Sequence, residues 1–272
     1  MTVLVLGSGG REHALALACH RDPEVVAVHV APGNPGTASF ATNHDIDPCE
    51  CAAGVSLARD MGADLVVVGP EAPRVAGVAD VLREAGIDCF GPSAEAARLE
   101  GSKAFAKDVM AAAGVPTAGS RSCDDAESVA AALDEFGAPY VVKDDGLAGG
   151  KGVIVTKDRA EALAHAERCF ESGHLVVIEE YLDGPEVSLF AVCDGTRALP
   201  MQPAQDFKRV GDGGVGPNTG GMGAYTPLPW APDDLVETVS ATIISPTLRL
   251  MADRGTPFVG LLYVGLALTS AG

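Results

Sequence analysis

The first hundred residues alternate between short apolar runs and longer amphipathic stretches. Each apolar run is four to six residues long and ends in a turn that contains glycine or proline, which is typical of buried strands. Strands are expected at 3–6, 25–30, 65–68 and 87–90, and helices near Arg11 and within 52–61 and 75–85. Strands and helices that alternate across short connections predict a parallel, doubly wound α/β sheet.

Three loops at the predicted strand ends carry residues suited to a small anionic ligand. They are Gly7-Ser8-Gly9-Gly10, Pro32 to Thr37, and Gly69-Pro70-Glu71. Ligands of such sheets bind at the carboxyl ends of the strands, and a helix N-terminus attracts an anion. We therefore expect Ser8–Gly10, Asn34–Thr37 and Glu71 to converge on one ligand. The alternative is a plain strand-to-helix turn in which the glycines serve packing.

A nicotinamide dinucleotide is disfavoured at the first loop. The dinucleotide fingerprint requires a third glycine where this chain has Glu12, and an acid at the end of the second strand. That strand instead ends in Ala31-Pro32-Gly33.

The second half of the chain is organised around VVKDDGLAGGKGVIV, from Val141 to Val155. Both ends are β-branched, so the pattern predicts two strands joined by a long glycine-rich loop. Glycines allow backbone N–H groups to approach an anion, and Lys143 and Lys151 add positive charge for a polyphosphate. An ordinary hairpin with a flexible tip is the alternative. The loop is not a Walker A motif, because Lys151 is followed by Gly152 instead of a hydroxyl residue and no helix follows.

Further elements are expected around this hairpin. Ser102 is placed to cap a helix that ends at Gly114, and Asp125 precedes another. The stretch 211–223 is so rich in glycine that we expect a loop without regular structure. The other helices are expected at 126–136, 159–170 and 233–254, and the other strands at 175–178, 187–192 and 260–268.

An acidic stretch, EEYLDGPE from Glu179 to Glu186, follows one of these strands. A bound nucleotide would explain why this acidic stretch occurs together with a lysine-bearing loop. Adenine needs an acceptor for its amino group, and ribose hydroxyls suit a carboxylate such as Glu186. An acidic surface turn is the alternative.

Composition narrows the class of protein. The 272 residues leave room for about two domains. A net charge of −18 argues against a nucleic-acid partner. The seven cysteines are irregularly spaced, which favours reduced thiols in the cytoplasm, and neither a leader nor a membrane-spanning run is expected.

Taken together, these stretches resemble the phosphoribosylamine–glycine ligase family (glycinamide ribonucleotide synthetases) of ATP-grasp enzymes. The resemblance is colinear, covers all 272 residues and departs at Gly149, where the family usually has alanine. The matching stretches are GSGGREHALA from Gly7, APGNPGTA from Ala31, VVGPEAPRVAGVAD from Val67, FGPSAEAARLEGSKAFAKDVM from Phe90, the hairpin from Val141, VIEEYLDGPEVSLF from Val177, and QDFKRVGDGGVGPNTGGMGAYTP from Gln205.

The resemblance implies a fold and a set of site residues. The fold is a substrate-binding α/β domain at 1–101, followed by an ATP-grasp fold with a small lid subdomain at 102–187 and a larger, truncated subdomain at 188–272. The catalytic lysines would be Lys143 and Lys151. ATP would be held by Lys103, Lys143, Gly146, Gly149, Gly150, Lys151, Gly152, Glu179, Glu180, Leu182 and Glu186. Phosphoribosylamine and glycine would be held by Ser8, Gly9, Gly10, Asn34, Gly36, Thr37, Glu71, Asp206, Lys208, Arg209, Asn218, Thr219, Gly220 and Gly221.

The implied reaction is ATP-dependent ligation of glycine to 5-phosphoribosylamine through glycyl phosphate. ATP and Mg²⁺ or Mn²⁺ are the implied cofactors, and the protein is expected to be a cytoplasmic monomer. The family's metal ligands lie in a segment expected beyond Gly272, so this 272-residue chain is expected to lack turnover. The alternatives are another ATP-grasp carboxylate–amine ligase and a nucleotide-binding fragment without catalysis; an NAD oxidoreductase ranks behind both.

Overall fold

The computed structural model describes residues 1–147 and 152–270, and for Pro217 and Asn218 it describes the backbone alone. The chain forms two compact units. Unit 1 contains Met1–Arg98 and Gly255–Gly260, and unit 2 contains Leu99–Arg254 and Leu261–Gly272. The division lies three residues before the boundary expected at residue 101. The further boundary expected at 187 stays a prediction, although strand β10 (Glu186–Asp194) spans it.

Unit 1 is built on a five-stranded sheet in the order β3-β2-β1-β4-β5, with every pair parallel. The prediction of a parallel sheet is confirmed. The second strand begins two residues later than expected, at Ala27 instead of Val25. The strands are β1 (Thr2–Gly7), β2 (Ala27–Pro32), β3 (Thr42–Asn43), β4 (Leu65–Val68) and β5 (Cys89–Phe90).

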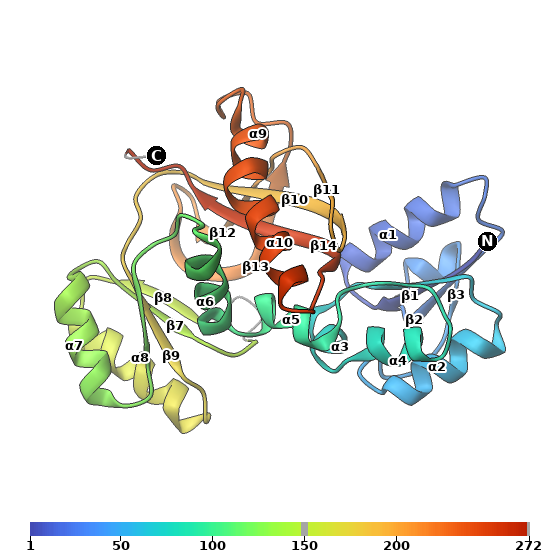
Figure 1. The fold of residues 1–272 in the computed structure, drawn as a ribbon, viewed down its shortest axis with the longest axis horizontal. Helices are drawn as coiled ribbons and strands as arrows, with labels where there is room; N and C mark the ends of the chain where they lie inside the picture. Colours follow the sequence, from blue (N-terminus) through green and yellow to red (C-terminus); the bar gives the residue numbers. More distant parts are fainter. Residues whose placement is uncertain (148–151, 271–272) are drawn as a thin grey trace. The chain divides into compact units, whose positions relative to one another are not determined.

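Helices cover both faces of this sheet (Figure 1). Strand residues alternate in direction, so Val3 and Val5 pack with Ala16 of α1 (Gly10–Arg21), while Leu4 and Leu6 face the other side. On that side the core includes residues of α2 (Cys51–Asp60) and α4 (Val78–Glu84). The other helices of this part of the chain are η1 (Thr37–Ser39), α3 (Glu71–Val75) and α5 (Ala94–Gly101). The sheet is therefore doubly wound, as the pattern predicted.

Unit 2 contains a four-stranded antiparallel sheet in the order β6-β9-β7-β8. Helices α7 (Ala126–Phe136) and α8 (Arg159–Glu171) pack on one of its faces (Figure 1). The expected hairpin is confirmed as β7 (Tyr140–Asp144) paired with β8 (Val153–Thr156). The other two strands are β6 (Ser120–Cys123), at one edge of the sheet, and β9 (Val176–Glu179), between β6 and β7.

Leu133 of α7 provides a test of this packing. Its side chain is 1% exposed, in the cluster that includes Val142 and Ile178. Leu133→Ala is expected to lower the free energy of unfolding by about 2–5 kcal/mol, through lost burial and the cavity that remains. Leu199→Ala, at a site 71% exposed, is the matched control and should change it little. Urea unfolding followed by Trp230 fluorescence measures both, and equal losses would contradict the assignment of the core.

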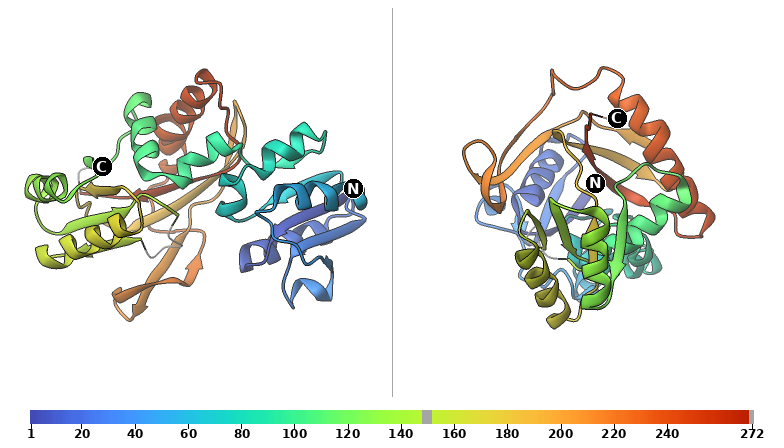
Figure 2. Two further views of the ribbon diagram at one scale, coloured as in Figure 1. Left: turned by 90° about the horizontal axis from the view of Figure 1, so that it is seen from below. Right: turned by 90° about the vertical axis from the view of Figure 1, so that its left-hand side faces the viewer.

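The rest of unit 2 forms a second sheet and a long hairpin. The sheet has the order β11-β10-β14, and β12 pairs with β13 in a hairpin that extends away from it (Figure 2). The expectation of an unstructured loop at 211–223 was wrong. Residues 215–225 form a strand because β12 supplies its hydrogen-bonding partner, in a register broken by two irregularities. The strands are β10, β11 (Ala198–Pro200), β12 (Gln205–Gly211), β13 (Val215–Tyr225) and β14 (Val259–Ala267).

Helix α6 (Lys103–Ala113) begins at the expected cap, where the Ser102 hydroxyl accepts a hydrogen bond from the Phe105 N–H. The predicted helix at 233–254 is present but not uniform. It comprises α9 (Leu235–Val239), a π-helical segment η2 (Ser240–Ile244) and α10 (Ser245–Asp253). Pro246 has no N–H to continue an α-helical ladder, and a π turn before it accommodates that loss.

No helix within 1–147 or 152–270 is long and apolar enough to cross a membrane.

Candidate functional site

The three expected loops of unit 1 follow β1, β2 and β4, three neighbouring strands of the parallel sheet. The direction in which successive strands are added to the sheet reverses between β1 and β4, because β2 and β3 lie on one side of β1 and β4 and β5 lie on the other. This is the position at which open α/β sheets bind ligands. The Gly33 N–H donates to the Gly7 carbonyl at 3.2 Å, and the Asn34 amide donates to the Ser8 carbonyl at 3.0 Å. The first two loops are thus joined to each other.

The Asn34–Thr37 loop is ordered by its own side chains. The Asn34 side-chain oxygen accepts from the Gly36 N–H at 2.8 Å and the Thr37 N–H at 3.0 Å. The Thr37 hydroxyl is completely buried and accepts from the Asn34 N–H at 2.8 Å. Asn43 of β3 donates to the Asn34 carbonyl at 2.8 Å. Asn34 and Thr37 therefore shape the loop, and any contact of theirs with a ligand stays a prediction.

Arg11 and Glu12, which the sequence did not single out, support the first and third loops. Glu12 is 3% exposed, accepts from the Gly9 N–H at 2.8 Å, and lies 2.6 Å from Nε of Arg11. Arg11 also pairs with Glu71 at 3.1 Å. Burial alone raises the pKa of Glu71, but Arg11 outweighs burial and holds that pKa below its ordinary value. Glu71 is therefore anionic at neutral pH, at the edge of this group of loops.

Unit 2 places two lysines on one buried carboxylate, and a third lysine lies one helical turn away. Lys143 of β7 lies 2.6 Å from one oxygen of Glu179, and Lys107 of α6 lies 3.4 Å from the other. Lys103, one helical turn before Lys107, donates to the Gly146 carbonyl at 3.1 Å. Burial lowers the pKa values of Lys103 and Lys107. The neighbouring acidic side chains oppose this effect, because they favour the charged form of each lysine. The cluster lies on the sheet face opposite α7 and α8, since Lys143 and Glu179 alternate with Val142 and Ile178.

The base of the glycine-rich loop is fixed to α6. Asp145 accepts from the Ala104 N–H at 2.7 Å and from the Ser102 hydroxyl at 2.9 Å, so a carboxylate caps this helix N-terminus. Asp144 accepts from the Gly146 N–H at 2.9 Å and lies 2.8 Å from Nδ1 of His174. Gly149, Gly150 and Lys151 lie outside the described residues, and their roles remain predictions.

The Asp144–His174 contact predicts a dependence of stability on pH. Burial alone raises the pKa of Asp144, but the Gly146 N–H and His174 outweigh it and hold that pKa below its ordinary value. A carboxyl with a depressed pKa stabilises the fold above its unfolded-state pKa of about 3.9, and this contribution is lost as the pH falls through the folded-state pKa. Asp144→Asn should therefore lower the Tm at pH 7, and the difference from the unchanged chain should shrink below about pH 4.

Thermal unfolding between pH 2.5 and 7 measures this difference. Asp212→Asn removes an exposed carboxylate from the same unit and is the control. A Tm difference for Asp144→Asn that stays constant over the whole pH range would contradict the prediction.

Glu186 and Lys208, predicted for ribose and for the acceptor respectively, lie beside each other. The Lys208 ammonium lies 3.6 Å from Glu186 and 3.5 Å from Asp206. Burial opposes the charge on Lys208, but Tyr263, Asp206 and Glu186 outweigh burial and raise its pKa. Glu186 is mostly exposed, so its carboxylate is accessible to a ligand hydroxyl. The structure therefore brings together two groups that the sequence treated separately.

The remaining predicted residues lie around these clusters in unit 2. The Glu180 N–H donates to the Gly119 carbonyl at 2.9 Å, and Leu182 is exposed. Arg209 donates to the Gly216 carbonyl at 2.8 Å, and the Thr219 hydroxyl donates to the Lys208 carbonyl at 2.9 Å. Gly152 accepts from the Asp144 N–H at 2.7 Å, and Gly220, Gly221 and the backbone of Asn218 belong to β13.

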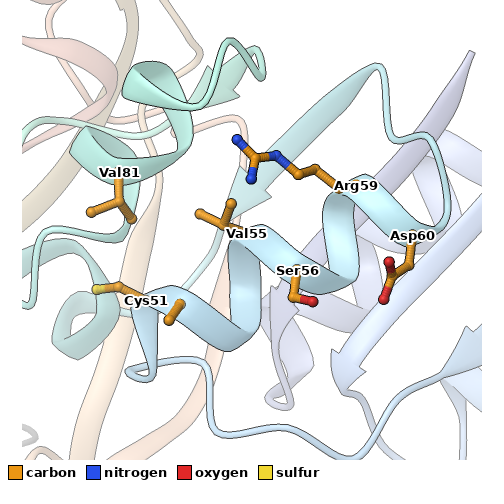
Figure 3. A pocket seen from close by; sticks show the side chains of 7 residues that line it. Cys51, Val55, Ser56, Arg59, Asp60 and Val81 are labelled. Atoms are coloured by element: carbon orange, nitrogen blue, oxygen red, sulfur yellow. The ribbon is translucent and has the colours of Figure 1, made fainter.

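A hollow of about 560 Å³ lies along α2 and α4 in unit 1, lined by Cys51, Val55, Arg59 and Val81 among others (Figure 3). None of the residues singled out from the sequence lines it. Within the described part of the chain, no three histidine, cysteine or acidic side chains converge into a group that could hold a metal ion.

Comparison with known proteins assigns the whole chain to one family. Residues 1–100 match the N domain of phosphoribosylglycinamide synthetase, and residues 101–272 match its ATP-grasp (A) domain. The chain belongs to the phosphoribosylglycinamide synthetase family. Two curated relatives are the phosphoribosylamine–glycine ligases of Streptomyces coelicolor, 64% identical over 272 residues, and Mycobacterium leprae, 59% identical over 277.

All of this chain aligns with 64% of the Streptomyces protein and 66% of the Mycobacterium protein, so it spans about two thirds of the length of these synthetases. Among solved structures, the phosphoribosylamine–glycine ligase of Thermotoga maritima superposes with a TM-score of 0.83 at 34% identity, over 99% of this chain and 66% of that one. The ADP complex of an N5-carboxyaminoimidazole ribonucleotide synthetase has a TM-score of 0.75 at 18% identity, which supports the ATP-grasp fold alone. The predicted family and fold class are confirmed.

Proposed function

We propose that the chain carries the ATP-binding and phosphoribosylamine-binding parts of a phosphoribosylamine–glycine ligase. The observation that supports this most directly is the pair of Lys107 and Lys143 on Glu179, with Lys103 one helical turn before Lys107. In a chain with a net charge of −18, two lysines of α6 and one of β7 make a local site for an anion. Family membership supports the triphosphate of ATP as that anion.

The proposed reaction has two steps. The glycine carboxylate attacks the γ-phosphorus of ATP, which forms glycyl phosphate and releases ADP. The amine of 5-phosphoribosylamine then attacks the glycyl carbonyl, the amide bond forms, and phosphate leaves. Phosphoryl transfer of this kind depends on positioning and charge neutralisation more than on covalent catalysis. This agrees with a site rich in lysine and glycine.

We propose the following roles for the residues of each unit. In unit 2, Lys103 and Lys143 neutralise the phosphates, the backbone after β9 holds adenine, and the exposed carboxylate of Glu186 accepts from the ribose hydroxyls. In unit 1, the loops at Ser8–Gly10 and Asn34–Thr37 hold the substrate phosphate, and anionic Glu71 attracts its amine. Asp206, Lys208, Arg209 and the Asn218–Gly221 segment complete the glycine site. A divalent metal ion, which the family implies, would neutralise further charge on the phosphates.

Two measurements test the proposal. Calorimetry on the 272-residue chain should detect ATP binding in unit 2 and ribose 5-phosphate binding in unit 1. A chimera that continues this chain with the last third of the Streptomyces coelicolor relative should release phosphate from ATP only when phosphoribosylamine and glycine are both present. Equal phosphate release with other amino acids would indicate a different ATP-grasp ligase. Binding of neither ligand would contradict the proposal.

A further inference from the structure

Glu179 has an unusual position for a carboxylate, because it is buried at the end of a central strand. Its side chain is 9% exposed, and β9 lies between β6 and β7 in the sheet. Each of its oxygens has its own lysine, Lys143 on one and Lys107 on the other. A buried carboxylate that loses its counter-charge is strongly destabilising. The two lysines nevertheless differ in how firmly they are held.

Lys107 is fixed in place. Besides Glu179, its ammonium donates to the Thr117 hydroxyl at 2.8 Å and to the Ala118 carbonyl at 3.0 Å. These three acceptors match the three N–H groups of an ammonium. The side chain is 12% exposed, and its acceptors lie on α6's own connection to β6 and on β9. Moving Lys107 would break all three contacts.

Lys143 is the more accessible lysine. Its side chain is 27% exposed, and it projects from β7, the strand that leads into the glycine-rich loop. Its ammonium lies 2.6 Å from Glu179, on the oxygen that Lys107 does not contact. A phosphate that draws the Lys143 ammonium toward itself weakens or breaks this ion pair. The negative charge of Glu179 would then be balanced by Lys107 alone.

We propose that Lys107 is a positioning residue that acts as the permanent counter-charge of Glu179 and so allows Lys143 to transfer to a nucleotide phosphate. This inference rests on the proposed function. Without Lys107, the departure of Lys143 would leave a buried carboxylate unpaired, so Lys143 would stay on Glu179 and phosphate binding would weaken. With Lys107 present, the oxygen that Lys143 vacates can accept a hydrogen bond from the amino group of adenine, the role that the resemblance gives to Glu179.

The first experiment does not need a nucleotide. A thermal-unfolding cycle compares the unchanged chain with Lys107→Met, Lys143→Met and the double variant, and Trp230 fluorescence follows unit 2. Either single variant leaves Glu179 one lysine, but the double variant leaves none. The Tm of the double variant should fall at least about 5 °C further than the sum of the single effects, and adding Glu179→Gln should restore most of that extra loss. Additive effects would overturn the proposal.

The second experiment measures ATP and adenosine affinity in the same variants. Lys107→Met should weaken ATP binding roughly tenfold with little effect on adenosine, because it acts through a lysine that contacts phosphate. In the Lys143→Met background, the same substitution should change ATP affinity by less than about twofold. Lys157→Met removes one exposed lysine from unit 2 and controls for the lost charge.

The outcomes separate the two proposals. Parallel losses of ATP and adenosine affinity would indicate a purely structural Lys107 and overturn its positioning role, as would unchanged ATP affinity in Lys107→Met. If the unchanged chain bound neither ATP nor adenosine, the proposed function would fail and the transfer of Lys143 would fail with it. The unfolding cycle would then decide separately whether Lys107 is the counter-charge of Glu179.

Discussion

Lys143→Met is expected to weaken ATP binding by about 1.5–3 kcal/mol, or roughly 10- to 150-fold, since it removes one charge-assisted phosphate contact. Methionine keeps much of the length and apolar stem of lysine, so packing on the open face of the sheet is retained. Lys107 remains beside Glu179, so the Tm of the variant without ligand should stay close to that of the unchanged chain.

Calorimetry with ATP, ADP and adenosine measures the loss. It should be large for ATP and absent for adenosine, which has no phosphate to contact. Lys157→Met is again the control for removing one positive charge from unit 2. Unchanged ATP affinity, or an equal loss for adenosine, would remove Lys143 from the phosphate site.

Much of the fold could be predicted because local patterns and tertiary packing agree. The buried strand Leu65–Val68 and the helix after the Ser102 cap occur where the sequence placed them. Residues 211–223 show the limit of this approach. Glycine has weak local preferences, so its conformation is decided by the partner strand Gln205–Gly211, and no pattern within the segment identifies that partner.

In the candidate site, too, some residues could be predicted from the sequence and others could not. Lys143, Glu179 and Glu186 could be found because glycine-rich and acidic stretches are visible in the sequence. Lys107 was missed although it follows Lys103 by four residues on one helix face, a spacing that could have revealed it. Its contact with Glu179 joins residues 72 positions apart, and such a pairing depends on how α6 packs. Arg11 and Glu12 were missed because Glu12 was considered only as a mismatch to a dinucleotide fingerprint.

Glu12→Ala is expected to destabilise unit 1 by about 2–4 kcal/mol. The substitution removes the acceptor of the Gly9 N–H and the partner of Arg11, and it leaves a cavity beneath the loop. The Glu12 side chain occupies the space next to Gly7 and Gly69, so it packs against two of the three strand-end loops at once. Its loss should therefore loosen the first and third loops together. Ribose 5-phosphate affinity should fall with the stability.

Two control variants separate the effect of the volume of the Glu12 side chain from the effect of its charge. Glu12→Gln keeps the volume and one acceptor oxygen for Gly9, so it should lose about 1 kcal/mol and retain most of the ligand affinity. Glu84→Ala removes an exposed carboxylate from helix α4 and should have little effect. Because Trp230, the single tryptophan, lies in unit 2, amide hydrogen exchange on peptides of unit 1 is the suitable measurement. Unchanged protection around Gly9 in Glu12→Ala would show that this buried carboxylate does not hold the loop.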